Sequence, residues 1–70
     1  MKPTDIIGKV VSFDHHGSRL VGTATAAKDN GKTARGAIPD LLVTVQGSTG
    51  KQVTVSFVES YMRVSNPYRP

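Results

Sequence analysis

The chain has 70 residues and no cysteine, which excludes disulfides and thiolate metal sites. Nine Lys and Arg against five Asp and Glu give a formal net charge of +4, so anionic partners such as nucleic acid or acidic protein surfaces are favoured. No apolar run reaches the roughly 20 residues of a membrane span, and the N-terminal residues 1–13 contain no apolar run long enough for a signal peptide. We therefore expect a single cytoplasmic domain over residues 1–70, with flexible ends at 1–5 and 66–70.

The first part of the chain predicts an antiparallel pair of strands. Segments 7–13 and 19–27 both place apolar side chains at alternate positions, the period of a half-buried strand. The linker DHHGS between them supplies Asp and Gly for a turn. Gly22 lies inside the second segment and predicts a bulge or a sharp bend.

A polar stretch follows, AAKDNGKTARGAIPD at residues 26–40. It is rich in glycine and in cations and has few residues that favour burial, so it predicts a long connection from Lys28 to Pro39. The sequence leaves open whether this connection is ordered.

The strongest pattern is LLVTVQGSTGKQVTVSF at residues 41–57. β-Branched and polar residues alternate on both sides of GSTG, whose glycines can adopt positive φ, so the segment predicts a β-hairpin. The following VESY predicts one helical turn, and YMRV at 61–64 predicts a short last strand.

This order of elements is similar to that of an SH3-like small barrel. A short sheet with one apolar face must curl to bury that face, and closure protects its edge strands. The sequence therefore predicts an all-β fold, a five-stranded SH3-like small barrel with one short helical turn before the last strand. Its predicted core consists of inward-facing apolar residues: Val11, Phe13, Leu20, Ala24, Leu41, Val43, Val45, Val53, Val55, Phe57, Met62 and Val64.

Two looser resemblances concern parts of this pattern. Residues 8–27, GKVVSFDHHGSRLVGTATAA, resemble the opening of KOW-type barrels, in which a strand, a glycine turn and a Val-Gly strand follow each other. The strand order is also similar to that of plasmid-encoded type II dihydrofolate reductases, which build a pore from several such barrels. Those enzymes carry Val-Gln-Ile-Tyr on the penultimate strand, whereas this chain reads QVTVSF at 52–57. The second resemblance therefore implies strand order and not reductase activity.

Two stretches look like phosphate-binding loops, but neither fits the motif. The GKT segment at 31–33 requires a glycine at position 26, which is Ala26, and the GK pair at 50–51 is followed by Gln52. Neither stretch lies between a predicted strand and a predicted helix, so nucleotide hydrolysis is not expected.

The sequence offers no catalytic or metal-binding group. His15 and His16 are adjacent, so their side chains diverge and cannot readily share one metal ion. The carboxylates are scattered, mostly at predicted strand ends, and no nucleophile is paired with a base. We therefore expect a protein that is not an enzyme, with no catalytic residue, no metal site and no cofactor.

The cations are more informative than the carboxylates. In an SH3-like barrel, the first turn and the long connection can lie near one rim, where cations would form one patch for a phosphate backbone. The alternative is that a basic connection only keeps a small β protein in solution and blunts its sheet edge. The predicted nucleic-acid-binding residues are Arg19, Lys28, Lys32, Arg35 and Lys51.

The outer face of the 41–57 hairpin is uncharged. Depletion of charge is typical of interfaces, so this face is either a homo-oligomer or partner contact or an ordinary solvated surface. Surfaces that bind RNA or single strands usually carry aromatic side chains for stacking, and here Tyr61 and Tyr68 are the candidates. Duplex DNA is therefore favoured over RNA. The possible interface residues are Leu42, Thr44, Gln46, Gln52 and Thr54.

We therefore hypothesise a small basic accessory protein of bacterial, phage or plasmid type. It would grip the phosphate backbone of nucleic acid, duplex DNA with little sequence preference. The alternative is a protein–protein interaction module, an adaptor, an inhibitor or a small subunit, that meets an acidic partner. Salt-dependent DNA affinity separates these two hypotheses. The third hypothesis is an oligomeric type II reductase-like enzyme, which a monomeric mass would exclude.

Overall fold

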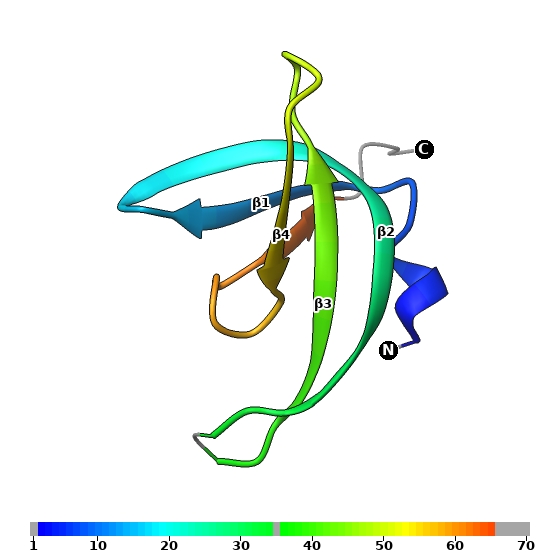
Figure 1. Ribbon diagram of the computed structural model, residues 1–70, viewed down its shortest axis with the longest axis vertical. Helices are drawn as coiled ribbons and strands as arrows, with labels where there is room; N and C mark the ends of the chain where they lie inside the picture. The colour runs from blue at the N-terminus through cyan, green and yellow to red at the C-terminus, as the bar shows by residue number, and fades with distance from the viewer. Residues whose placement is uncertain (1, 35, 66–70) are drawn as a thin grey trace.

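The computed structural model describes residues 2–34 and 36–65, and the regular secondary structure of this part consists of strands apart from one 3-10 turn. Antiparallel ladders join the strands into one sheet in the order β4-β3-β2-β1-β5 (Figure 1). The predicted five-stranded all-β fold is confirmed. The elements are η1 (Pro3–Asp5), a single 3-10 turn, and the strands β1 (Val10–His15), β2 (Ser18–Lys32), β3 (Pro39–Gln46), β4 (Gln52–Ser56) and β5 (Arg63–Ser65).

The sheet curls because β2 belongs to both of its halves. The first part of β2 pairs with β1, and from Thr23 onward β2 pairs with β3, so the strand bends around the core (Figure 1). No ladder joins β4 to β5 within the described residues, so the sheet remains open. The fold is a barrel-like curled sheet, and the predicted closed barrel is not formed.

β2 is longer than the sequence pattern indicates. The predicted connection from Lys28 to Pro39 is wrong over its first part, because β2 continues to Lys32. Lys28 pairs with Leu42 and Lys32 pairs with Pro39, after an irregularity in the ladder. Only residues 33–38 separate the end of β2 from the start of β3, so most of the polar stretch is a two-stranded ribbon.

The core lies on the concave side of the sheet and contains most of the predicted residues. Leu20 and Val64, which were predicted as core, are 39% and 37% exposed. Leu20 lies near the β1–β2 turn, and Val64 lies on the edge strand β5, so neither is covered on all sides. Ile6 follows η1 and is fully buried, although no periodic pattern marks it. The buried apolar residues are Ile6, Val11, Phe13, Ala24, Leu41, Val43, Val45 and Met62, and Ala27, Val53, Val55 and Phe57 pack against them.

Gly22 was predicted to mark a bulge or a sharp bend, and the structure shows a close approach between strands at this residue, with no bulge. The ladder irregularity lies two residues further on, between Ala24 and Ala26. A Cβ atom at Gly22 would lie 2.6 Å from the Gln46 carbonyl oxygen and 2.7 Å from a methyl group of Val45. Gly22 therefore allows β2 to bend tightly against the end of β3.

The helical turn predicted after the hairpin is a series of hydrogen-bonded turns over residues 57–61. The Ser60 amide donates to the Ser56 carbonyl at 3.1 Å, and the Tyr61 amide donates to the Val58 carbonyl at 3.1 Å. Tyr61 has a φ of 52° and ends this segment, which we call the 57–61 turn. The segment crosses from β4 to β5 without forming a helix.

Candidate nucleic-acid interface

The predicted basic connection is a β-ribbon, which we define as residues 28–40 and call the basic ribbon. It consists of the ends of β2 and β3 and the turn between them, and it extends away from the β1–β5 part of the sheet (Figure 1). At its tip, the Thr33 amide donates to the Ile38 carbonyl at 2.9 Å, and the Ile38 amide donates to Thr33 Oγ1 at 3.3 Å. Hydrogen bonds thus close the ribbon just below the tip. Arg35, a predicted contact, lies outside the described residues.

Gly31 and Asp29 form the irregular part of the ribbon. Gly31 has a φ of 68°, and its amide donates to Asp29 Oδ1 at 3.0 Å. Gly31 readily adopts this left-handed conformation because it has no Cβ atom. The same hydrogen bond occupies one oxygen of the carboxylate that lies next to Lys28 in the sequence.

Asp40 anchors the base of the ribbon. It is 5% exposed, and it accepts hydrogen bonds from Ser56 Oγ at 2.6 Å, from the Val58 amide at 2.9 Å and from Asn30 Nδ2 at 2.9 Å. Burial alone would raise the pKa of Asp40, but these hydrogen bonds, with a further one from the Leu41 amide, outweigh it and lower the pKa. A buried carboxylate therefore joins both ribbon strands to β4 and to the 57–61 turn.

Lys28 and Lys32 are the ribbon cations that the structure describes. Both are exposed, and neither forms an ion pair with any residue in the described ranges. Lys28 lies on the outer face of the sheet, where it borders a shallow groove with Leu42 and Thr54. Their ammonium groups are therefore available to a solvent-borne anion.

Arg19 has a different environment from the ribbon lysines. Its Nη1 donates to Asp14 Oδ1 at 2.8 Å, and its Nη2 donates to Ser12 Oγ at 3.1 Å and to the Tyr61 carbonyl at 3.0 Å. Arg19 thus holds the 57–61 turn against β1. It borders a depression with Arg63 on the outer side of β1 and β2, and this depression shares no residue with the groove that Lys28 borders.

Tyr61 lies between these two groups of residues. Its side chain is 65% exposed. It borders one shallow depression with Arg19 and Arg63 and a second one with Thr33 and Ile38 at the ribbon tip. The sequence singled out Tyr61 as a stacking candidate, and the fold places it beside the ribbon. The other candidate, Tyr68, lies outside the described residues.

Lys51 is remote from the ribbon. It follows the turn between β3 and β4, at the opposite end of β3 from Lys28 and Lys32. The five predicted cations therefore do not form one patch in the described structure. Lys28 and Lys32 share the ribbon, whereas Arg19 and Lys51 each lie elsewhere.

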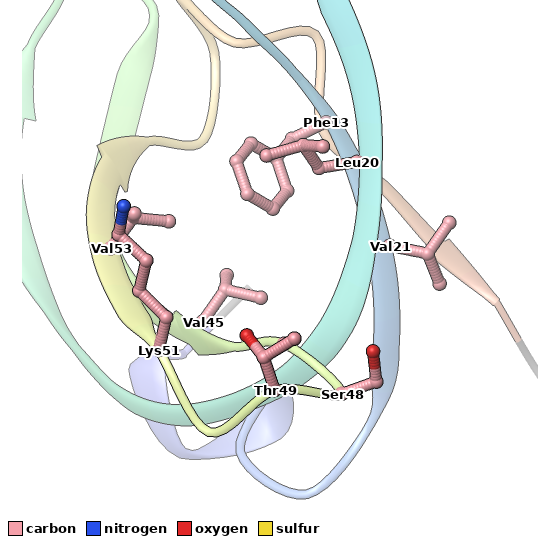
Figure 2. A pocket seen from close by; sticks show the side chains of 9 residues that line it. Phe13, Leu20, Val21, Val45, Ser48, Thr49, Lys51 and Val53 are labelled. Atoms are coloured by element: carbon pink, nitrogen blue, oxygen red, sulfur yellow. The ribbon is translucent and has the colours of Figure 1, made fainter.

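Lys51 borders an apolar pocket of about 220 Å³ that the sequence did not predict. Figure 2 shows Phe13 and Leu20 projecting into it from one side and Val45 and Val53 from the other. The pocket exists because the open sheet leaves this end of the core uncovered. Leu20 is partly exposed because it lines this pocket. Hydrophobic alternation in the sequence cannot distinguish a residue that lines a pocket from a core residue.

The predicted interface residues do share one face of the hairpin. Thr44 Oγ1 and Thr54 Oγ1 lie 3.0 Å apart across β3 and β4, and Leu42 is half-buried beside them. Lys28 borders the same face from β2, so the face is uncharged over β3 and β4 but not beyond them. The predicted residues on it are Leu42, Thr44, Gln46, Gln52 and Thr54.

The described residues contain no group of three or more His, Asp or Glu side chains that is arranged to hold a metal ion. No helix within residues 2–34 and 36–65 is long and apolar enough to cross a membrane. Comparisons with models of known protein families, with curated proteins and with solved structures give no match.

Proposed function

We propose that this protein is a non-enzymatic accessory protein that binds the phosphate backbone of duplex DNA through the basic ribbon. The observation that carries the proposal is the placement of Lys28 and Lys32, exposed and without an ion pair in the described ranges, on a hydrogen-bonded ribbon. Two-stranded ribbons fit the grooves of duplex DNA, and lysines on them neutralise phosphates whatever the base sequence. The net charge of +4 favours the encounter.

Two further features support this proposal. Asp40 fixes the ribbon to the sheet, so less conformational freedom is lost when an anion binds. Tyr61 lies beside the ribbon tip, where it can contact sugars or an unpaired base. The SH3-like and KOW-type resemblances, the cytoplasmic location and a phage or plasmid setting belong to the same proposal.

A salt series of binding measurements tests the proposal. Fluorescence anisotropy with a labelled duplex would be recorded for the wild type and for Lys28→Ala/Lys32→Ala. The control is Lys9→Ala/Lys51→Ala, which lowers the net charge equally but at exposed positions outside the ribbon. We expect the slope of log affinity against log salt to become shallower by about 2 in the ribbon variant, because each phosphate contact contributes about 0.9. Adding Arg35→Ala should reduce the slope again.

The control variant decides the interpretation. If it weakens binding as much as the ribbon variant does, binding depends on net charge and not on the ribbon. If the wild type binds neither duplex nor single strand at low salt, the proposal is wrong.

The apolar pocket favours a second candidate, a protein–protein interaction module. Phe13, Leu20, Val45 and Val53 line a site of about 220 Å³, which is large enough for one apolar side chain of a partner. Lys51 at the rim would favour an acidic flanking residue. Under this candidate, Leu20→Lys abolishes partner binding. Salt-dependent DNA affinity would be absent.

A further inference from the structure

The outer edge of β4 carries backbone groups with no partner in the described residues. The Phe57 amide donates to the Leu41 carbonyl at 2.8 Å, so this pair is hydrogen-bonded. Antiparallel ladders alternate bonded and non-bonded pairs, so the backbone groups at every second position of β4 point away from β3. The Ser56 carbonyl also points outward, but it accepts hydrogen bonds from Ser60. The other outward groups of β4 have no backbone partner among the described residues. These groups are the amides of Gln52, Thr54 and Ser56 and the carbonyls of Gln52 and Thr54.

This edge lacks the usual protection against pairing. Sheet edges are commonly blocked by charged residues, proline, bulges or short strand length. β5, at the other edge, has three residues and carries Arg63. β4 has five residues, no charge and no proline, and its register with β3 is continuous from Gln52 to Ser56. β4 is therefore the edge on which another strand can pair.

We propose that a second copy of this chain pairs with this edge, β4 against β4 in antiparallel orientation, with Thr54 on the two-fold axis. The β4 sequence QVTVS alternates polar and β-branched residues symmetrically about Thr54, so it matches itself when reversed. Each copy carries a formal net charge of +4, so two copies repel each other. Contact through the uncharged strand β4 adds less repulsion than contact through a surface that carries Lys or Arg. The inference is independent of DNA binding.

The register defines the interchain hydrogen bonds. The two Thr54 residues exchange two bonds, and each Ser56 amide donates to the Gln52 carbonyl of the other copy. The Ser56 carbonyl contributes nothing, because it already accepts bonds from the Ser60 amide and hydroxyl. With so few bonds, we expect a dimer that dissociates on dilution.

Sedimentation velocity from micromolar to millimolar concentration tests this inference. The wild type should shift from a 7.5 kDa monomer to twice that mass. Thr54→Lys places two cations opposite each other at the axis and should keep the protein monomeric. Thr23→Lys is the matched control, because Thr23 is an exposed strand residue away from this edge, and it should dimerise like the wild type.

Disulfide crosslinking tests the same register by trapping the paired strands, whereas Thr54→Lys prevents them from pairing. Because the chain has no cysteine, Thr54→Cys introduces a single thiol, which should form a disulfide dimer on mild oxidation. Thr23→Cys should remain largely uncrosslinked. A wild type that is monomeric at millimolar concentration overturns the inference and leaves the edge to a strand of another protein. Equal crosslinking of the two thiols, or a Thr54→Lys variant that still dimerises, overturns it as well.

Discussion

Replacing Asp40 tests whether a buried carboxylate holds the ribbon to the rest of the sheet. Asp40→Ala removes the acceptor for Ser56 Oγ, Asn30 Nδ2 and the Val58 amide together. A hydrogen bond to a charged group contributes about 1.5–3 kcal/mol, and a buried donor that loses its partner adds a penalty. Part of this loss of stability is offset, because the alanine variant has no carboxylate that must be desolvated on folding. We expect a net loss of about 3 kcal/mol in the free energy of unfolding.

That loss is large for a domain of this size. At about 0.05–0.15 kcal/mol per residue, the whole chain has roughly 4–10 kcal/mol of stability. The midpoint of thermal unfolding, followed by circular dichroism, should fall by roughly 15 °C. Asp29→Ala is the matched control, because Asp29 is exposed and accepts one bond, from the Gly31 amide. Equal losses in the two variants would refute the reasoning, as would a loss below about 1 kcal/mol in Asp40→Ala.

The pH dependence of stability in a second variant, Asp40→Asn, gives another check. The pKa of Asp40 is lowered below its ordinary value of 3.8, so folding favours the charged form. The stabilisation is therefore complete above the unfolded pKa and is lost as the pH falls through the lower folded pKa. The stability difference between the wild type and Asp40→Asn should be constant near neutral pH and should shrink below about pH 4. A difference that grows in acid would contradict this assignment.

Three further substitutions test the packing. Gly22→Ala places a Cβ atom 2.6 Å from the Gln46 carbonyl oxygen and should cost about 1–3 kcal/mol in urea unfolding, whereas Gly47→Ala, whose Cβ would have its nearest neighbour at 3.9 Å, should cost less. Val55→Asp puts an unpaired charge against the core and should abolish the cooperative thermal transition; native stability would mean that the β4 register is wrong. Ile6→Ala removes a fully buried side chain and should cost about 2–5 kcal/mol, so a neutral result would show that the segment after η1 does not pack.

The strands that could be predicted from the sequence are those with one buried face and one exposed face, because only these show alternating apolar and polar residues. Val43 and Val45 alternate with Thr44, and the resulting β3–β4 hairpin has the expected register. The end of β2 lacks this contrast, because both of its faces are exposed between Lys28 and Lys32. Its strand character comes from pairing with β3, a tertiary interaction that local composition does not reveal.

The errors in the predicted core have a similar origin. Leu20 follows the alternation of its strand, but it lies where the open sheet leaves the core uncovered. Ile6 follows a single 3-10 turn, too short a segment for any periodicity. Composition is enough to single out the ribbon cations as candidates, whereas the positions of Arg19 and Tyr61 depend on the bend of β2 and on the 57–61 turn.

Chemical-shift mapping tests most directly whether DNA contacts the basic ribbon. A ¹⁵N-labelled sample would be titrated with a short duplex at low salt, and the amide shifts would be followed residue by residue. If the ribbon binds DNA, the largest shifts should occur over residues 28–40 and at Tyr61, with little change at the turn between β3 and β4. Shifts concentrated around Leu20 and Lys51, or no shifts at all, would contradict it.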